Sequence, residues 1–581
     1  MSVLVKQAIT QIRTAIMDAA GRAVADGEFE PCPLSDFIIE VPANRANGDY
    51  SSNAAMAWAR DLHKAPRAIA QILADRMMLE DTFVSRFEIA GPGFMNFYLD
   101  DTFGACIIED ILEKKEDYGK STYGGGRKIN VEFVSANPTG PMHMGNARGG
   151  ALGDCLASVL ECAGYEVSRE FYVNDAGNQI DKFGLSLDIR YQQLFLGENA
   201  PELPEDSYHG DDITERAKEF ADVYGDKYMN VSEQERRQAL IDFALPKNIE
   251  NMKVNMKKYR ISYDTWFLES TLHNDGELNE IINILKEKGL TYEKDGALWY
   301  KNSEVLAERL RREGKSDADI EKLELKDEVL IRQNGNPTYF AADIAYHRNK
   351  LAVRGFDRAI DVWGADHHGH IARMKGALDA VGLDGDRLDV LLMQLVNLIK
   401  DGKPVKMSKR SGKAITLTDL LDEIPIDAVR FFFNTREPGS PIDFDLDLAI
   451  SQNSENPVYY CQYAHARICS ILAKLAENNI QPRKCTLKEL MLLKEDEEKE
   501  LIRHLASYTD EIISAAKYYD PAKITRYAVE LATLFHKFYN AHRVNCDDES
   551  LMQARVSLCL SVKTVLANIL NMFSITVPDK M

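Results

Sequence analysis

The chain has 581 residues, of which 45% are hydrophobic and 28% are charged. These proportions exclude a largely disordered, collagen-like or disulfide-scaffold protein, and the length predicts three or four domains. No apolar run is long enough to span a membrane. Because 91 acidic residues face only 70 basic ones, nucleic acid cannot be bound through bulk positive charge, and local basic patches and shape would have to do so.

The first 120 residues predict a small α+β domain. Apolar residues at helical spacing predict a helix over residues 1–27, and a second helical pattern covers residues 50–76. Strand character on both sides of the Gly-Pro-Gly turn at 91–93 predicts paired strands, and residues 103–115 predict another helix.

Residues 121–446 predict a doubly wound, Rossmann-like α/β domain. A strand at 128–135, a helix from about 145 to 162 and a strand at 167–173 form a βαβ unit, which begins a parallel sheet. The α/β pattern returns at 338–400, so we expect the charged segment at about 186–320 to be an insertion. Residues 447–581 are almost entirely helical in pattern and predict a separate all-α bundle.

A first chemical signature joins the strand at 128–135 to its helix, at the sheet edge where ligands bind. His143 and Asn146 lie three residues apart and face the same way on a first helical turn. Gly145 lies between them and has no Cβ, so a flat base could approach the backbone there. Helix amides and two neutral donors suit phosphate oxygens, although the same pattern also fits a polar helix cap.

A second signature is the glycine-flanked loop at 401–413, which carries four lysines and one arginine. Such lysines could close over a triphosphate and neutralise the charge of a departing pyrophosphate. By itself, the composition fits a solvated basic loop equally well.

Together the two signatures resemble a known family. Residues 143–146 resemble the HIGH motif and residues 406–410 resemble the KMSKS motif of class I aminoacyl-tRNA synthetases, with Asn146 and Arg410 as departures from the pattern. The wider context resembles the arginyl-tRNA synthetases over essentially the whole chain, at 48–53, 91–96, 135–143, 171–178, 339–347, 363–367 and 456–467.

The resemblance implies roles for the motif residues. The implied catalytic residues are His143, Asn146, Lys406 and Lys409. The implied ATP-binding residues are His143, Gly145, Asn146, Lys406, Met407, Ser408 and Lys409.

The chemistry of the arginine side chain determines what kind of pocket can bind it selectively. A guanidinium is a rigid fork of donors that stays charged, so a selective pocket needs a carboxylate within reach. Tyr339 and Asp343 lie four residues apart on one face of a predicted helix. The resemblance places both on the arginine side chain, and it places Ser135 and Asn137 at the α-amino and carboxylate end. His367 completes the expected set, although whether Asp366 or His367 contacts the ligand stays open.

The run at 366–370 contains three histidines, which invites a zinc hypothesis. Neighbouring residues of an extended segment point to opposite sides, so we favour pocket or cap roles and predict no metal site formed by the protein. The nine cysteines are odd in number and show no C-x-x-C spacing, which predicts a reduced, cytoplasmic protein.

Aromatic residues recur at helical spacing in the C-terminal region, at Tyr459, Tyr460, Tyr463, Phe535, Phe538 and Tyr539. Such stripes are usually core. The resemblance implies that this bundle binds the anticodon, where bases can stack on exposed rings, so we expect one or two of these rings to face RNA. It also implies that the N-terminal domain contacts tRNA.

The function implied by the resemblance is ATP-dependent activation of L-arginine to arginyl-adenylate, followed by transfer to the 3′-terminal adenosine of tRNA(Arg). The expected cofactors are ATP and Mg²⁺, with the ion bound through the ATP phosphates. The partners would be tRNA(Arg) and L-arginine, with no membrane, and the protein is expected to be a monomer. The alternatives are a class I synthetase for another amino acid and a noncatalytic tRNA-binding paralogue; the intact motif histidine and lysines argue against the second.

Overall fold

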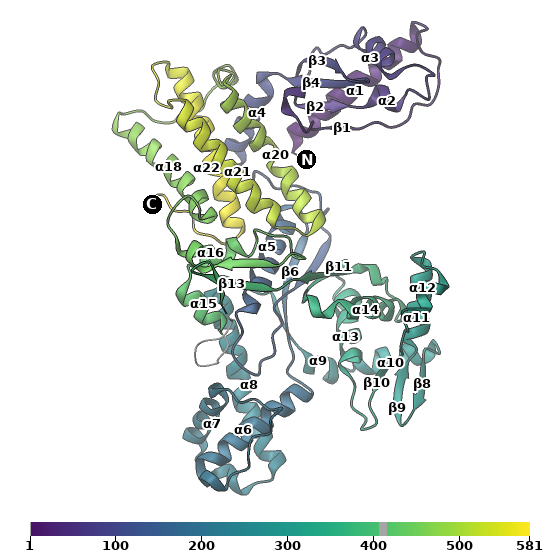
Figure 1. Cartoon of the computed structure of the whole chain (residues 1–581), viewed down its shortest axis with the longest axis vertical. Helices are drawn as coiled ribbons and strands as arrows, with labels where there is room; N and C mark the ends of the chain where they lie inside the picture. The colour runs from purple at the N-terminus through teal and green to yellow at the C-terminus, as the bar shows by residue number, and fades with distance from the viewer. Residues whose placement is uncertain (1, 406–414) are drawn as a thin grey trace.

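A parallel sheet lies at the centre of the molecule. The computed structural model describes residues 2–405 and 415–581, and Figure 1 shows the sheet with the N-terminal domain and the C-terminal helices on one side and two inserted units on the other. None of the helices in this described part of the chain combines the length and apolar character needed to cross a membrane.

The central sheet has five parallel strands in the order β12-β11-β5-β6-β7. They are β5 (Lys128–Glu132), β6 (Glu166–Val173), β7 (Thr265–Leu268), β11 (Arg358–Gly364) and β12 (Leu388–Met393). The chain runs outward from β5 to β7 and then resumes at β11 on the other side of β5. The switch point therefore lies between β5 and β11, and carboxyl ends of strands at such a point bind ligands in open α/β sheets. This confirms the predicted doubly wound class.

Helix α5 (Gly145–Cys162) connects β5 to β6 and packs very close to the sheet. Small residues make this approach possible. A Cβ built on Gly153 would lie 2.1 Å from Cγ of Phe133, which is buried just beyond β5. The position of α5, and of the motif at its start, thus depends on the absence of a side chain at Gly153.

The segment expected as one insertion, 186–320, forms two units separated by β7. The first unit is a helical cluster, and its members are α6 (Asn178–Leu196), α7 (Asp211–Tyr224) and α8 (Glu233–Lys258). The second unit contains α9 (Glu269–Asn274), α10 (Glu277–Glu287), β8 (Thr291–Lys294), β9 (Ala297–Tyr300), α11 (Asn302–Arg312), α12 (Asp317–Glu321) and β10 (Glu328–Ile331). A four-residue strand between charged helices leaves little sequence signal, which is why β7 was hidden within the expected insertion.

The chain returns to the sheet through α13 (Tyr339–Arg348), which continues as a π-helical turn over Asn349–Val353, and through α14 (His368–Ala380). The last part of the α/β pattern predicted at 338–400 forms two strands, β12 and β13 (Val396–Lys400). A small second sheet has the order β14-β13-β15, with β14 at Lys403–Val405 and β15 at Ile442–Asp445. The helices between residue 415 and the C-terminal bundle are α15 (Leu417–Glu423), α16 (Ile426–Phe432) and α17 (Leu446–Ile450).

The N-terminal domain has an antiparallel sheet in the order β1-β2-β4-β3. Its elements are α1 (Val3–Ala25), β1 (Ile39–Glu40), β2 (Tyr50–Ser52), α2 (Ala54–Ala57), α3 (Pro66–Ala74), β3 (Val84–Ala90) and β4 (Phe94–Leu99). Helix α4 (Asp101–Lys114) follows and packs against the C-terminal helices. The antiparallel sheet with helices confirms the predicted α+β character.

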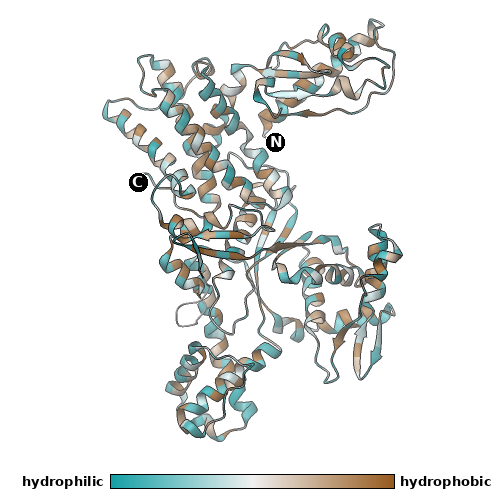
Figure 2. Ribbon diagram, in the orientation of Figure 1, coloured by the Kyte–Doolittle hydropathy of each residue, from teal (hydrophilic) through white to brown (hydrophobic). Residues whose placement is uncertain are grey.

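The C-terminal region is the predicted all-α bundle. Its helices are α18 (Pro457–Glu477), α19 (Leu487–Leu490), α20 (Asp496–Tyr518), α21 (Ala522–Ala541) and α22 (Glu549–Met572). Figure 2 shows hydrophobic residues along the central strands and on parts of these helices, with hydrophilic residues between them.

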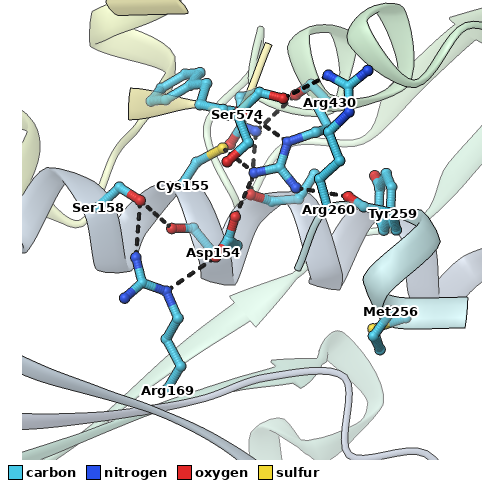
Figure 3. A network of polar contacts seen from close by, with 12 residues as sticks. Asp154, Cys155, Ser158, Arg169, Met256, Tyr259, Arg260, Arg430 and Ser574 are labelled. Carbon is cyan, nitrogen blue, oxygen red and sulfur yellow. Dashed lines mark hydrogen bonds and ion pairs between the residues drawn. The ribbon is translucent and has the colours of Figure 1, made fainter. Parts of the chain in front are cut away.

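One buried guanidinium joins the bundle to the sheet domain. Arg430 on α16 is fully buried and donates to the Asp154 carboxylate on α5, to the Tyr259 carbonyl after α8, and to the Phe573 carbonyl after α22. Figure 3 shows this contact and a second ion pair that joins Asp154 to Arg169 on β6. Four separate parts of the chain therefore meet at one guanidinium.

Candidate functional site

A cavity of about 520 Å³ opens at the switch point between β5 and β11. Residues after β5, on β6 and at the end of β11 form one side, and α13 and α14 form the other. Its polar lining includes Glu132, Ser135, Tyr172, Asp343, His367 and His370. The volume is typical of a small-molecule site.

The chain leaves β5 in a strained conformation at the cavity wall. Val134 and Ser135 both have left-handed backbone angles, with φ of +71° and +42°. The hydroxyl of Ser135 donates to Oε1 of Glu132 at 2.8 Å and accepts from the amide of Tyr172 at 3.1 Å. Strain of this kind persists only where neighbouring contacts hold it in place, and it is concentrated at functional sites.

A buried charge network lies beneath this wall. Lys350, which has no exposed surface, donates to Glu132 and, at 2.9 Å, to Asp361 on β11. Lys350 belongs to the π-helical turn after α13, and π-helical turns occur often at functional sites. The lysine supports Glu132, which in turn supports Ser135.

His347 extends the network toward α13. Its Nε2 lies 2.7 Å from the Asp361 carboxylate, and its Nδ1 lies 2.7 Å from the carbonyl of Asp343. Since both partners are acceptors, both nitrogens must donate, and the ring is a buried cation. Burial opposes this charge, but the neighbouring Asp361 carboxylate prevails and raises the pKa of His347. Burial also opposes the charge of Asp361, but Lys350 and His347 lower its pKa to about 2.

A second carboxylate lies close to Asp343. Glu269 follows β7 directly, is buried, and shares a hydrogen bond with Tyr172. Burial and the nearby Asp343 and Asp175 carboxylates raise the pKa of Glu269 to about 7, although the hydrogen bond to Tyr172 opposes the shift. His273 lies 3.8 Å from Glu269. Because the Asp343 carboxylate contributes to the raised pKa of Glu269, the two carboxylates together favour a cationic ligand.

Glu132 and Glu269 are absent from the site residues expected from the sequence. Each lies at the carboxyl end of a parallel strand, and that position is the sequence feature by which it could have been identified as a site residue. Glu132 lies in the predicted strand but precedes the motif, and Glu269 was hidden because β7 had been assigned to the insertion.

The first signature lies where the chain enters α5: Asn146 is on the helix, whereas His143 precedes it, so the two do not share the expected helical turn. The amide oxygen of Asn146 accepts from the backbone N–H of His143 at 3.0 Å, which leaves the Asn146 amino group available as a donor. His143 is exposed, and a Cβ on Gly145 would have nothing within 4 Å. Helix α5 has no side-chain cap at its N-terminus. These features suit an anion next to a flat ring.

The second signature falls on residues 406–414, which lie outside the described residues, so the structure does not locate Lys406, Met407, Ser408 or Lys409. The segment that follows them is described, and it pairs with the first signature. His143 forms a β-bridge with Thr416; the Met144 amide donates to the Ile415 carbonyl at 3.0 Å, and the Leu417 amide donates to the Met142 carbonyl at 2.9 Å. Stretches about 270 residues apart in the sequence therefore meet at His143.

Only some of the expected arginine-binding residues line the cavity. Ser135, Asp343 and His367 line the cavity. Asn137 is exposed, and Tyr339 is 39% exposed one helical turn before Asp343; neither belongs to the cavity lining. Asp366 and His367 both line the cavity, and Nε2 of His367 lies 3.6 Å from Oδ2 of Asp366.

Outside the cavity, the described residues bring three potential metal ligands together in the C-terminal bundle: His465, Cys469 and Asp579. Their contacts are already satisfied within the protein. Nδ1 of His465 donates to the Pro578 carbonyl at 2.9 Å, and the Cys469 thiol donates to Asp579 at 3.2 Å.

The C-terminal aromatic stripe divides into buried and accessible rings. Phe535 and Phe538 are fully buried. Tyr463 is partly exposed and stacks with Tyr459 at 6.3 Å between ring centroids, and the Arg467 guanidinium lies 4.9 Å from the Tyr539 ring. Accessible rings beside a guanidinium can stack with bases.

Comparisons with known proteins identify the family of this chain. Three family models match the chain: the arginyl tRNA synthetase N terminal domain at residues 6–99, the catalytic domain of class I (R) tRNA synthetases at 107–437, and the DALR anticodon binding domain at 461–581. The arginine–tRNA ligase of Caldanaerobacter subterraneus is 53% identical over the full length of both chains, and that of Ruminiclostridium cellulolyticum is 50% identical over 98% of each.

Solved structures show the same fold. Thermus thermophilus arginyl-tRNA synthetase matches with a TM-score of 0.70 at 23% identity, covering 98% of this chain and all of the other. Mycobacterium tuberculosis methionyl-tRNA synthetase matches with a TM-score of 0.55 at 11% identity, covering 77% of this chain and 91% of its own. On the three domain matches and the full-length relatives, the chain belongs to the arginyl-tRNA synthetase family of class I aminoacyl-tRNA synthetases.

Proposed function

We propose that this enzyme activates L-arginine with ATP and transfers it to tRNA(Arg), and that it does so at the switch-point cavity. The observation that carries this proposal is a single juxtaposition. An acidic cavity containing Asp343 opens at the same sheet edge where His143 pairs with the segment that follows the KMSKS-like loop. A cationic amino acid and a nucleotide would therefore be bound side by side.

The acidic part of the cavity would hold the guanidinium. Asp343 offers a partly exposed carboxylate, and Glu269 and Tyr172 lie behind it. Tyr339, one turn earlier on α13, would cover the side chain from the cavity edge. A permanently charged fork of donors fits such a group of acceptors better than any other amino-acid side chain does.

The other end of the cavity would hold the amino acid backbone. Ser135 and Glu132 lie at the carboxyl end of β5, and Asn137 follows on the loop that leads to His143. Their oxygens can accept from the α-ammonium, and the Asn137 amide can bind the carboxylate. His367 would form the outer wall. The carboxylate of arginine would then face the start of α5.

The chemistry needs no covalent intermediate with the protein. A carboxylate oxygen of arginine attacks the α-phosphorus of ATP, the bond between this phosphorus and the α,β-bridging oxygen breaks, and pyrophosphate leaves. His143, Asn146 and the positive end of the α5 dipole would bind phosphate oxygens, and Lys406 and Lys409 would neutralise the departing pyrophosphate, with Met407 and Ser408 alongside the nucleotide. Mg²⁺ would enter with ATP, bound through its phosphates. Catalysis of this kind is positioning and electrostatics.

The second step uses the same site. The hydroxyl of the terminal tRNA adenosine attacks the activated carbonyl, and AMP leaves. The aromatic face of α18 and α21 is the proposed surface for anticodon bases, with Tyr463 and Tyr539 as its accessible rings. The nine cysteines are all free, which suits a reducing cytoplasm. A monomer is the proposed state.

A variant that affects catalysis but not arginine binding tests the role proposed for His143. The His143→Ala variant should lower the turnover of arginylation roughly 10²-fold to 10³-fold, because it removes a donor that acts on the reacting phosphates. Its arginine affinity, measured by calorimetry, should stay close to that of the unaltered protein. Equal losses in turnover and arginine affinity would remove His143 from its proposed role.

A further inference from the structure

The histidine-rich run at 366–370 contains one residue whose contact differs from those of its neighbours. Nε2 of His370 lies 3.1 Å from Oδ2 of Asp343, the carboxylate proposed to bind the guanidinium. His367 contacts Asp366 instead, and His368 is exposed and does not line the cavity. Since a carboxylate oxygen can only accept, the imidazole donates from Nε2.

Two aromatic rings fix the orientation of this imidazole. The ring of Trp363 at the end of β11 lies 5.6 Å away, and the ring of Phe340 on α13 lies 5.9 Å away in an edge-on arrangement. The side chain of His370 is 20% exposed, at the first turn of α14. A ring held between two others and anchored on a helix cannot swing freely, so its N–H direction is set by the fold.

The contact occupies one oxygen of Asp343 and leaves the other accessible. The Asp343 side chain is 36% exposed and lines the cavity, and within the described residues its Oδ1 makes no hydrogen bond. The Asp343 backbone is held separately, because its carbonyl accepts from the buried His347. Both the backbone and the side chain of Asp343 are therefore restrained, and the carboxylate keeps one oxygen for a ligand in the cavity that the residue lines.

We propose that His370 is a positioning residue for arginine recognition, which turns Asp343 so that one carboxylate oxygen is presented to the guanidinium. This inference rests on the proposed function and extends it to the choice of side chain. A neutral imidazole can donate to Asp343 without cancelling its charge, whereas lysine or arginine at this place would be a permanent cation that competes with the ligand.

Three variants at this position separate orientation from charge. His370→Leu removes the donor and should weaken arginine binding roughly 10-fold to 100-fold, the usual effect of losing a hydrogen bond to a charged group. His370→Gln places an amide donor near the position of Nε2 and should recover most of the loss. His370→Lys should weaken binding at least as much as His370→Leu, because the ammonium group neutralises Asp343.

The readouts are the arginine dissociation constant by calorimetry, the KM for arginine and for ATP in arginylation, and the inhibition constant of citrulline, a neutral analogue of arginine. We expect the KM for ATP to change by no more than about twofold, which is the size of effect that a surface substitution has. The preference for arginine over citrulline should fall in His370→Leu and His370→Lys. His368→Leu, on the same helical turn but exposed, is the matched control and should behave as the unaltered protein does.

Two outcomes would overturn the proposal. One is arginine affinity in His370→Leu equal to that of the His368→Leu control. The other is a parallel loss of arginine and ATP binding in all three variants, which would indicate a general disturbance of the site. If the unaltered protein failed to charge tRNA with arginine, the proposed function itself would fail, and that result is obtained independently of any variant.

Discussion

Single residues decide which ligand the cavity accepts, and Asp343 offers a partly exposed carboxylate in the cavity wall. Asp343→Asn keeps the shape of the side chain but removes its charge, which leaves a guanidinium without an anionic partner in a partly dehydrated pocket. We expect arginine affinity to fall roughly 10²-fold to 10³-fold, the scale on which broken buried ion pairs are felt. The KM for ATP should hardly change. Near-normal arginine binding by calorimetry would place the guanidinium elsewhere.

The raised pKa of Glu269 predicts how arginine binding depends on pH. Its pKa of about 7 means that the carboxyl is largely neutral below pH 7 in the free protein. A bound guanidinium favours the ionised form and lowers that pKa, so binding in this range releases a proton. Affinity should therefore increase about 10-fold as the pH rises from about 6 to about 8, and then level off.

The Glu269→Gln variant is the control for this dependence, because it cannot ionise. Its arginine affinity should be lower and nearly constant over the same range, when measured by calorimetry in buffers of different ionisation enthalpy. An equally steep dependence in Glu269→Gln would assign the proton to another group.

At the scale of elements, α5 holds the first signature in place because it lies so close to the sheet. Gly153→Ala would force a methyl group against Phe133, so that the helix or the strand must shift. Overpacking of this kind destabilises by about 1–3 kcal/mol. We expect a lower midpoint of chemical denaturation together with reduced arginylation.

The matched control for this variant is Gly21→Ala on α1, where a Cβ meets nothing within 4 Å. Alanine has the higher helix propensity, so this change should stabilise by about 1 kcal/mol or less. If the two variants had the same midpoint, close packing of α5 would not be what fixes its position.

Much of this arrangement could be predicted from the sequence. The strand–helix–strand pattern predicted the central sheet. The spacing of His143 and Asn146 predicted a shared helical turn, but only Asn146 lies on α5, because His143 precedes the helix and forms a β-bridge with Thr416. The pattern could not reveal β7, because a strand of only four residues between charged helices resembles part of a helix; Glu269 was missed with it. Nor could it reveal which histidine of 366–370 contacts Asp343, since that choice depends on where α14 begins relative to α13.

At the scale of the whole molecule, Arg430 connects the domains. Its guanidinium contacts α5, the residue after α8 and the segment after α22. The Arg430 side chain itself is fully buried. Arg430→Met would leave acceptors unpaired in the interior, Asp154 among them, and should lower the free energy of unfolding by about 3–5 kcal/mol. Arg311→Met, which removes an exposed ion pair with Asp317, should change it little. Equal denaturation midpoints for the two variants would contradict the role of Arg430.

The central claim is that an acidic cavity beside His143 selects arginine for reaction with ATP. Amino-acid-dependent exchange of labelled pyrophosphate into ATP, measured with each of the twenty amino acids and with tRNA(Arg) present, tests it most directly. The account predicts exchange with arginine and background rates with the other nineteen, lysine included. Exchange supported by a different amino acid, or by none while the protein is folded, would contradict it.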